Sequence, residues 1–400
     1  MTEPLARPPA DTIAWAKPED VGMSRERLAR IGEVLEADIA AGKLPGAVAL
    51  VARRGKIVHF KAYGSRDPAA ADAMERDTIF RIYSMTKPIV SVAAMTLVEE
   101  GRLDLGEWVS AFIPGFATVK VGESDGRLVD PVRPVTVHDL MRHTSGLTYD
   151  WMEDAPACRA YEAAASGRRD RSNREQSELL ATLPLLSQPG TRWDYGRSTD
   201  VLGRVIEVVT GLSLGEALRE RVLEPLGMQE TGFHVPEAFG HRMAEAHKID
   251  PDMGEPVSLL DLRKPVAQEN GGGGLASTAG DYARFLHMLV SGGTLDGIRI
   301  LSPATLAWMM SDHLGPEVAI GSDILPAGYG FGLGFAIRRQ DGLAAFPGSA
   351  GDAYWEGIAG TSFWVDPARR LYGLLMIQAP GRREHYRRLY RQLVYGALIE

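Results

Sequence analysis

The stretch Phe80-Arg81-Ile82-Tyr83-Ser84-Met85-Thr86-Lys87-Pro88 carries the sharpest signal in the chain. It contains the only Ser-x-x-Lys pattern in the sequence and leads directly into an apolar run that ends near residue 98. Because residues three apart on a helix share a face, the Lys87 amine would reach the Ser84 hydroxyl. Pro88 lacks an N–H, and prolines are tolerated chiefly in a first helical turn, so Ser84 is expected at the N-terminus of a helix.

This placement suits nucleophilic chemistry. Unpaired backbone N–H groups and the helix dipole would favour negative charge developing beside Ser84. A serine hydroxyl is a poor nucleophile until a base takes its proton, and a lysine desolvated in a pocket is neutral enough to do so. The alternative is a capping serine beside an exposed lysine, and the four-residue pattern alone does not decide between the two.

Strand signals lie near both ends of the chain. Residues 46–52 and 56–63 are β-rich runs separated by Arg54-Gly55, which predicts a hairpin with antiparallel strands. Further strand signals cover 330–337, 354–365 and 371–378. Between the two groups the chain consists of helical segments broken by Gly and Pro, the clearest at 137–143, 176–186, 200–210 and 213–222.

Strands at both ends with helices between them predict an α+β fold. In this fold an antiparallel sheet flanked by helices is built from both termini, and a mostly helical domain is inserted into it. The predicted boundaries are 1–105 and 275–400 for the sheet domain and 106–274 for the inserted domain. The active site is expected in the cleft between them.

Composition excludes several classes of protein. At 400 residues, 45 % hydrophobic and 24 % charged, the chain can bury a large core, which rules out disordered and disulfide-scaffold proteins. Its 44 basic and 52 acidic residues give a net charge of −8, which argues against nucleic acid or an anionic membrane as a partner. Cys158 is the only cysteine, so neither an internal disulfide nor a cysteine metal cluster is expected. Residues 1–20 resemble neither a signal peptide nor an anchor, and a cytoplasmic location is expected.

Two later segments add candidate site residues. The first contains Tyr195-Gly196-Arg197 and the second Trp355-Glu356-Gly357-Ile358. A phenol beside a lysine ammonium has a lowered pKa and can shuttle the serine proton, which makes Tyr195 a plausible partner of Ser84. Taken alone, Tyr195 and Trp355 would be read as packed aromatic residues.

Together with Ser84-Met85-Thr86-Lys87, these segments resemble the serine β-lactamase and penicillin-binding-protein superfamily, most closely the family VIII carboxylesterases, also called class C β-lactamase-like esterases. The likeness runs from about residue 45 to 380, with further matching segments at 143–147, 224–228 and 271–278. The resemblance implies the β-lactamase/transpeptidase-like fold, with Tyr195 as the catalytic tyrosine. It also implies an oxyanion hole made by the backbone N–H groups of Ser84 and Ile358, with Trp355 and Gly357 at the substrate.

Two departures from the penicillin-recognising members narrow the expected activity. Those members usually carry Asn or Ser where this chain has Arg197, and Lys where it has Trp355. Both losses argue against efficient β-lactam hydrolysis and favour a neutral acyl ester. Arg197 could receive a substrate carboxylate, or it could pair with Asp194 or Asp200, and the pairing is favoured.

Other patterns have simpler interpretations. Ser349 lies in a Gly-Ser-Ala-Gly segment that lacks the first glycine of a nucleophile elbow. The four glycines at 271–274 predict a flexible loop bordering the site and no phosphate cradle. His143 is expected to be a hydrogen-bonding residue at a helix end. The basic clusters at 168–174 and 382–391 are expected to be solvated faces.

The sequence thus predicts a serine carboxylesterase that hydrolyses short-acyl esters through an acyl-Ser84 intermediate, with no metal and no cofactor. Whether Lys87 or Tyr195 is the ground-state base stays open, because the two would titrate as a coupled pair. The alternatives are a β-lactamase or D-amino-acid peptidase, an acyltransferase, and a catalytically idle member that binds acyl compounds or peptides. An idle protein has no need to keep Ser84, Lys87 and Tyr195. The expected partner is a small-molecule ester, with no nucleic acid and no membrane, and the oligomeric state is not predicted.

Overall fold

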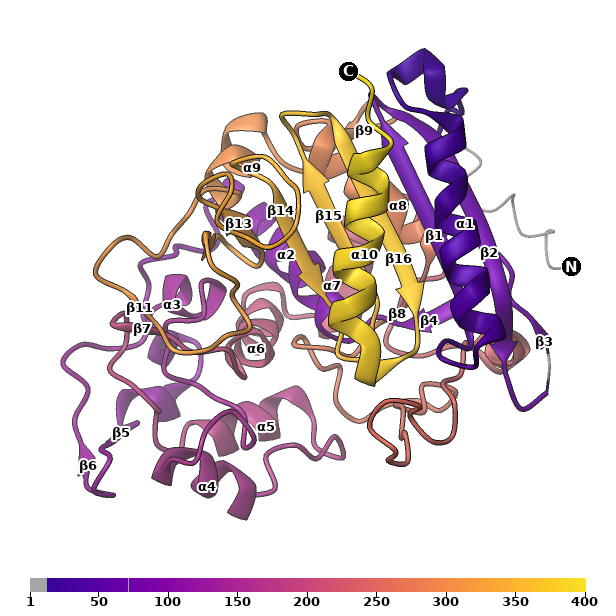
Figure 1. Ribbon diagram of the computed structural model, residues 1–400. Helices are drawn as coiled ribbons and strands as arrows, with labels where there is room; N and C mark the ends of the chain where they lie inside the picture. Colours follow the sequence, from indigo (N-terminus) through magenta and orange to yellow (C-terminus); the bar gives the residue numbers. More distant parts are fainter. Residues whose placement is uncertain (1–12, 71) are drawn as a thin grey trace, which may run out of the picture.

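The computed structural model describes residues 13–70 and 72–400, and its centre is an eight-stranded antiparallel sheet (Figure 1). Strands from both ends of the chain lie side by side, because β1 (Gly46–Arg53) pairs with β16 (Leu371–Ile377). The strand order is β12-β13-β14-β15-β16-β1-β2-β3. The remaining bounds are β2 Lys56–Asp67, β3 Asp72–Ala73, β12 Tyr329–Phe331, β13 Ala336–Arg338, β14 Ala353–Glu356 and β15 Ser362–Asp366. The α+β fold predicted from the sequence is confirmed.

The predicted hairpin at Arg54-Gly55 is also confirmed. Both residues have positive φ, +51° and +78°, which is the left-handed backbone that a tight two-residue turn requires. Of the segment 1–20, for which the sequence predicts neither a signal peptide nor an anchor, residues 1–12 lie outside the described part of the chain.

Two predicted strands were wrong in extent. Residues 330–337 form two short strands, β12 and β13, and residues 354–365 form β14 and β15. Each run folds back on itself at a glycine, Gly334 with φ +98° and Gly360 with φ +109°, conformations that other residues rarely adopt. The apolar runs therefore provide two antiparallel neighbours each, and the second turn brings residues 357–361 to the edge of the site.

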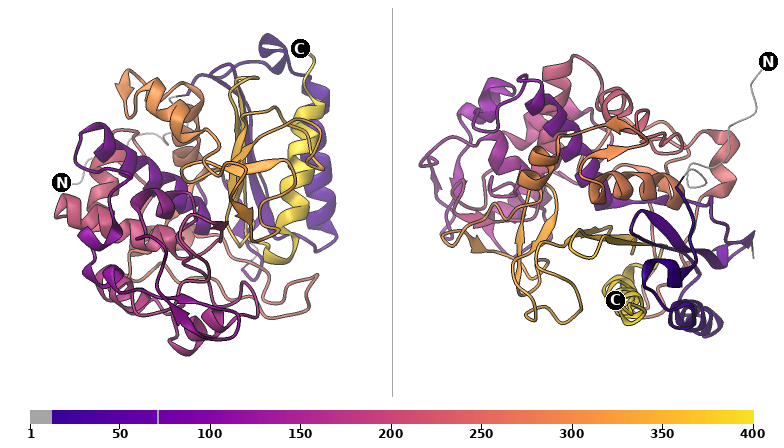
Figure 2. Two further views of the ribbon diagram at one scale, coloured as in Figure 1. Left: turned by 90° about the vertical axis from the view of Figure 1, so that its left-hand side faces the viewer. Right: turned by 90° about the horizontal axis from the view of Figure 1, so that it is seen from above.

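Helices cover both faces of the sheet (Figures 1 and 2). One face carries α1 (Arg25–Ala40), which begins after the capping residue Ser24, and α10 (Arg383–Gly396). The other face carries α8 (Ala279–Val290), with α2 (Thr86–Glu99) beside it. No helix among the residues described has the length and apolar character needed to cross a membrane.

The chain between the two groups of strands is mostly helical. One predicted helix, 176–186, was misplaced, because the helix begins after the cap Ser172 and ends at Leu180. Pro184 has no N–H to donate to the Leu180 carbonyl four residues earlier, so the helix does not continue through 186. The chain leaves and re-enters the sheet region where β4 (Ile79–Arg81) pairs with β8 (Ala276–Thr278). The domain boundaries at 105/106 and 274/275 stay a prediction. The helices of this part are α3 Val137–Met141, α4 Pro156–Ala163, α5 Asn173–Leu180, α6 Ser198–Thr210 and α7 Leu214–Leu218.

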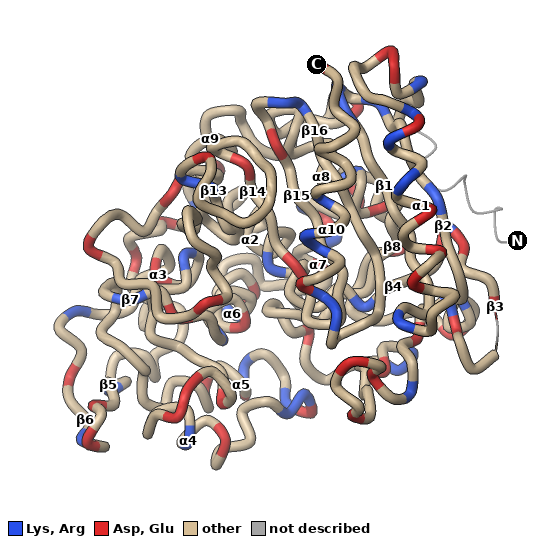
Figure 3. Tube along the Cα trace, in the orientation of Figure 1, with Lys and Arg blue, Asp and Glu red and all other residues tan. Residues whose placement is uncertain are grey.

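The basic cluster at 382–391 is not the solvated face that the sequence predicted. Figure 3 shows basic residues along α10, and two of them, Arg387 and Arg391, are largely buried members of ion pairs. Arg391 is 2 % exposed and pairs with Asp352, and Arg387 lies 2.6 Å from Glu356. The cluster therefore ties α10 to the strand that carries Trp355.

Asp352 holds this connection together. Its carboxylate accepts from Arg338 Nε and from the Tyr329 hydroxyl, both at 2.7 Å, and from Arg391. Asp352→Asn would leave two buried guanidinium groups facing a neutral amide. We expect a loss of about 3–5 kcal/mol of stability, measured as a lower urea midpoint by tryptophan fluorescence. Asp125→Asn, which removes an exposed ion pair with Arg127, should leave the midpoint unchanged, and equal midpoints for the two variants would contradict the assignment.

Candidate active site

Ser84 lies where β4 ends and α2 begins. It is the middle residue of a single 3₁₀ turn, Tyr83–Met85, which α2 continues directly. Tyr83 has a φ of +43°, a strained conformation for a non-glycine residue that is typical of functional turns. The expected position of Ser84 at a helix N-terminus is confirmed.

The Lys87 side chain is completely buried behind Ser84. Its Nζ lies 3.2 Å from Ser84 Oγ, 3.3 Å from the Tyr149 hydroxyl and 2.6 Å from the carbonyl oxygen of Gly272. Burial lowers the pKa of Lys87 from 10.5 to about 7, because desolvation disfavours the ammonium form, and the nearby Asp200 carboxylate opposes the shift. A substantial fraction of the amine is therefore neutral near pH 7 and able to accept the Ser84 proton.

Tyr195 lies between β7 (Arg192–Trp193) and α6, 6 % exposed. Lys87 Nζ is 4.6 Å from the centre of its ring. Burial raises the pKa of Tyr195 well above 10, although the Ser84 hydroxyl acts in the opposite direction. The sequence-based expectation of a lowered pKa was therefore wrong, since desolvation outweighs the Ser84 and Trp355 side chains, which act to lower the pKa. Tyr195 is a neutral phenol that can donate a hydrogen bond or relay a proton.

Tyr149 was not predicted as a site residue from the sequence, yet its hydroxyl is within hydrogen-bond distance of Lys87 Nζ. Its ring stacks on Trp151 with centroids 5.3 Å apart and meets Tyr195 edge to face at 5.6 Å. Burial raises the pKa of Tyr149 well above its usual value, so it stays a neutral partner of the amine. The only sequence signal for Tyr149 was its position, two residues beyond the family-like segment 143–147.

Trp355 forms the apolar wall of the site. It belongs to β14, is 2 % exposed, and its ring contacts those of Tyr195 and Phe331, each at a centroid distance of 5.2 Å. This aromatic cluster fixes the tyrosine from the sheet side. The indole offers a substrate an apolar surface where a lysine would offer charge.

The turn after β14 lies against the backbone that precedes Ser84. Gly357 N–H donates to the Thr361 carbonyl at 2.7 Å, and a Cβ on Gly357 would be 2.6 Å from the Ile82 carbonyl oxygen. Only glycine permits this approach. Within the described part of the chain, the N–H groups of Ser84 and Ile358 donate to no protein acceptor. The oxyanion hole expected at these two N–H groups stays a prediction.

Arg197 makes the ionic contact that was favoured from the sequence. Its Nη1 lies 3.6 Å from Asp200 Oδ2, and its guanidinium lies 4.7 Å from the centre of the Tyr149 ring. Asp194 instead pairs with Arg192 at 2.9 Å. The contact with Asp200 is longer than a good hydrogen bond, so it does not use the full capacity of the guanidinium.

His143 is a buried hydrogen-bonding residue, as predicted. Its Nδ1 accepts from Gly196 N–H at 3.4 Å, and its ring lies 5.0 Å from that of Tyr195. Burial lowers the pKa of His143 well below 6.5. It is a neutral support for the tyrosine segment.

The tetraglycine loop at 271–274 borders the site, but it is packed rather than flexible. All four glycines are buried. Gly272 N–H donates to Asp200 Oδ1 at 3.0 Å, and the Asn270 carbonyl accepts from Gly273 N–H at 3.1 Å and Gly274 N–H at 2.8 Å. The loop presents the Gly272 carbonyl to Lys87 and is part of the site.

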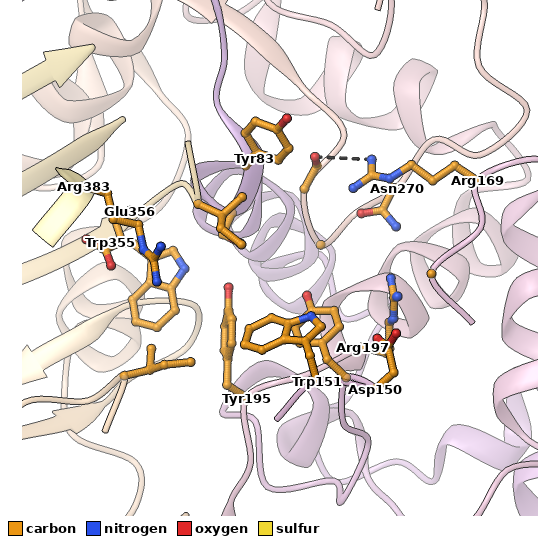
Figure 4. A pocket seen from close by; sticks show the side chains of 17 residues that line it. Tyr83, Asp150, Trp151, Arg169, Tyr195, Arg197, Asn270, Trp355, Glu356 and Arg383 are labelled. Carbon is orange, nitrogen blue, oxygen red and sulfur yellow. Dashed lines mark hydrogen bonds between the residues drawn. The ribbon is translucent and has the colours of Figure 1, made fainter. Parts of the chain in front are cut away.

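A cavity of about 400 Å³ opens at these residues (Figure 4), a size typical of small-molecule sites. Ser84, Tyr195, Arg197, Trp355 and Ile358 line it, whereas Lys87 and Gly357 lie behind its surface. Across residues 13–70 and 72–400, no group of three or more His, Cys, Asp or Glu side chains could hold a metal ion.

A serine at a helix N-terminus with a buried lysine one turn later, beside an antiparallel sheet, defines a serine hydrolase of the β-lactamase type. The Beta-lactamase family model matches residues 31–396, and the chain belongs to this family.

Three relatives are informative. The chain is 34 % identical to Esterase EstB of Burkholderia gladioli, over 87 % of this chain and 89 % of that one. It is 31 % identical to Lovastatin esterase of Penicillium rubens, over 86 % and 91 % of the two chains. The structure of EstCE1, a hydrolase with promiscuous acyltransferase activity, superposes with a TM-score of 0.77 at 27 % identity and covers 94 % of this chain and 99 % of that one.

The approach of Gly357 to the Ile82 carbonyl leads to a prediction. Gly357→Ala would place a Cβ 2.5 Å from Thr361 Oγ1 and 2.6 Å from that carbonyl oxygen, which forces the Ile358 N–H to move. We expect kcat for an ester to fall about 10²-fold with little change in KM, because an oxyanion donor acts mainly in the transition state. Gly396→Ala, where a Cβ meets open space, is the control, and full activity in both variants would argue against this role.

Proposed function

We propose that the protein is a serine carboxylesterase that hydrolyses short-acyl esters through a covalent acyl-Ser84 intermediate. The observation that carries the proposal is the buried Lys87 amine 3.2 Å from Ser84 Oγ, at a cavity walled by Trp355. Two relatives that match most of the chain at more than 30 % identity are named esterases. A cytoplasmic location is part of the same proposal.

In the acylation step, Ser84 Oγ attacks the ester carbonyl while the neutral Lys87 amine takes the hydroxyl proton. The carbonyl oxygen, now negatively charged, accepts from the N–H groups of Ser84 and Ile358. When the tetrahedral intermediate collapses, the C–O bond to the alcohol breaks and the proton passes through Lys87 and Tyr195 to the leaving alkoxide. Water then attacks the acyl carbonyl by the same route, which releases the acid and restores Ser84.

The wall next to Ser84 favours esters over β-lactams. Trp355 replaces a cationic side chain with an apolar surface, and its neighbours Tyr195 and Phe331 are aromatic as well. Transfer of the acyl group to an alcohol is the second candidate, because EstCE1 combines hydrolysis with that activity. The two outcomes differ only in which nucleophile reaches the acyl-enzyme.

The Ser84→Ala variant tests the nucleophile. With p-nitrophenyl butyrate we expect kcat/KM to fall at least about 10³-fold, because the remaining site can only bind and polarise the ester. Ser349→Ala, which changes the other serine in a glycine-rich segment, should keep full activity. Mass spectrometry of quenched wild-type protein should show one butyryl group on the peptide that contains Ser84. Undiminished ester hydrolysis by Ser84→Ala would disprove the site assignment.

A substrate panel then separates the activities. Wild-type protein is given p-nitrophenyl butyrate, a chromogenic cephalosporin and a D-alanyl dipeptide. The proposal expects the ester to have the highest kcat/KM, and faster turnover of the cephalosporin or the dipeptide would overturn it. Added butanol distinguishes hydrolysis from transfer, because an acyltransferase would produce mostly butyl butyrate.

The lowered pKa of Lys87 predicts the pH dependence. Below pH 7 the neutral fraction of the amine falls about tenfold per pH unit, so kcat/KM should rise with that slope and level off above about pH 7. Tyr195, with its raised pKa, should add no second rise below pH 10. Lys87→Arg stays cationic, so above pH 7 it should lose about 10²–10⁴-fold in kcat/KM, and its profile should lack the rise below pH 7. A flat profile from pH 5 to 9, with the fold intact by circular dichroism, would rule out Lys87 as the base.

A further inference from the structure

The cavity has a polar wall opposite the tryptophan. Figure 4 shows Arg169, Arg197 and Asn270 on one side and Trp355 with Arg383 on the other. The three residues of this polar wall come from separate segments: the link between α4 and α5, the residue before α6, and the residue before the tetraglycine loop. The acyl-transfer chemistry uses none of their side chains, and of the three only Arg197 lies against an aromatic ring, that of Tyr149.

Two of these side chains are buried with hydrogen-bond donors to spare. Arg197 is 8 % exposed at its side chain, and its Nε has no hydrogen-bond partner; its nearest carboxylate oxygen belongs to Asp200, 3.6 Å from Nη1. Asn270 is 2 % exposed, and its Nδ2 also lacks a partner, although its backbone carbonyl accepts from Gly273 and Gly274. Buried donors are nearly always paired in folded proteins, and these two line the cavity, where a ligand can supply the acceptor.

The third member of the wall, Arg169, makes one long hydrogen bond, from Nη1 to the Gly273 carbonyl at 3.4 Å. Elsewhere in the same protein, the buried Arg338 and Arg391 both donate to the carboxylate of Asp352, although Arg391 Nε also has no partner in the described part of the chain. At the cavity, the carboxylate oxygen nearest to Arg197 is 3.6 Å away, and across residues 13–70 and 72–400 Arg169 has only the Gly273 carbonyl as a hydrogen-bond acceptor. This difference indicates that a ligand supplies the missing acceptor.

Two acidic residues near this wall, Asp200 and Asp150, restrict the charge of the ligand. Asp200 Oδ1 accepts from Gly272 N–H at 3.0 Å, whereas its Oδ2 has no hydrogen-bond partner within the described chain and lies 3.6 Å from Arg197 Nη1, so Asp200 balances part of the charge of this wall. Asp150 lines the same cavity, and among the residues described it forms no ion pair within 4 Å. An acid on this wall disfavours a doubly charged phosphate and leaves room for one planar, singly charged group, which guanidinium and amide N–H groups bind well.

We propose that the preferred substrates are esters that carry a carboxylate, received by Arg197, Asn270 and Arg169 while Ser84 attacks the ester carbonyl. This inference rests on the proposed esterase function and names its substrate class. The carboxylate could belong to the acid half or to the alcohol half of the ester. The chemistry of recognition is the same in both cases.

The experiment compares each charged ester with its neutral amide isostere. In the first arm, monomethyl glutarate is compared with the methyl ester of glutaramic acid. In the second, the butyryl ester of glycolic acid is compared with that of glycolamide. The readout is the ratio of kcat/KM for acid over amide, and we expect about tenfold or more for wild type in at least one arm. The arm that shows the preference tells which half of the ester carries the carboxylate.

Variants test the residues. Arg197→Gln and the isosteric Asn270→Asp should each lower the ratio about tenfold, and Arg169→Gln about threefold, because each removes a donor or adds repulsion. Arg168→Gln, which changes an exposed neighbour paired with Asp170, is the matched control and should keep the wild-type ratio. The amide ester reports on the Ser84 machinery in every variant, so a general loss of activity cancels in the ratio.

Wild-type ratios near one in both arms, or ratios unchanged by all three substitutions, would overturn the proposal. Binding of glutarate to the Ser84→Ala protein, followed by calorimetry, gives a readout without turnover, and we expect Asn270→Asp to abolish it. Failure to hydrolyse any ester, together with intact glutarate binding, would refute the esterase function alone. Ester hydrolysis without glutarate binding or acid preference would refute only the carboxylate subsite.

Discussion

The burial of the Lys87 amine is the constraint on which the rest of the site depends. A lysine loses its hydration when it is buried, and the protein tolerates this only if the amine is neutral or well supplied with acceptors. Its acceptors come from three places in the chain: Ser84 on the same helical turn, Tyr149 after α3, and the carbonyl of Gly272. The base therefore exists only when the helical part and the sheet part of the protein have come together.

The tetraglycine loop follows from the same constraint. A Cβ on Gly272 would lie 2.8 Å from Asp200 Oδ1, and one on Gly271 would lie 2.6 Å from the Thr199 carbonyl oxygen. Since α6 carries Asp200 and begins just after Tyr195, any larger residue would separate the loop from the helix and withdraw the carbonyl from Lys87. The glycines let the loop pack closely against α6. The loop therefore makes the site rigid, although its glycine-rich composition suggests flexibility.

Sequence reasoning identified the parts of the site that local patterns encode. The spacing of Ser84 and Lys87 and the position of Pro88 were enough to place the nucleophile at a helix N-terminus, and strand signals at both ends were enough for the sheet. Tyr149 was missed because its role arises from a contact across 62 residues, which no local pattern records. The predicted direction of the Tyr195 pKa shift was wrong for a related reason. The sequence indicates a neighbouring lysine, but it does not show how deeply both groups are buried.

The two walls of the cavity have different roles: one supports the acyl-transfer chemistry, and the other selects the substrate. On the sheet side, Trp355 and the turn at Gly357 are held by regular strands, which suits donors that must meet a carbonyl oxygen within a few tenths of an ångström. On the other side, Arg197 precedes α6 and Asn270 precedes the tetraglycine loop, so the polar wall is built from segments separate from the strands that hold the oxyanion donors. Relative to the penicillin-recognising pattern, this chain has lost a cation at Trp355 and gained one at Arg197. Because Trp355 and Arg197 lie on opposite walls, an anionic substituent of an ester would lie on the wall opposite the one that carries the cation in the penicillin-recognising pattern.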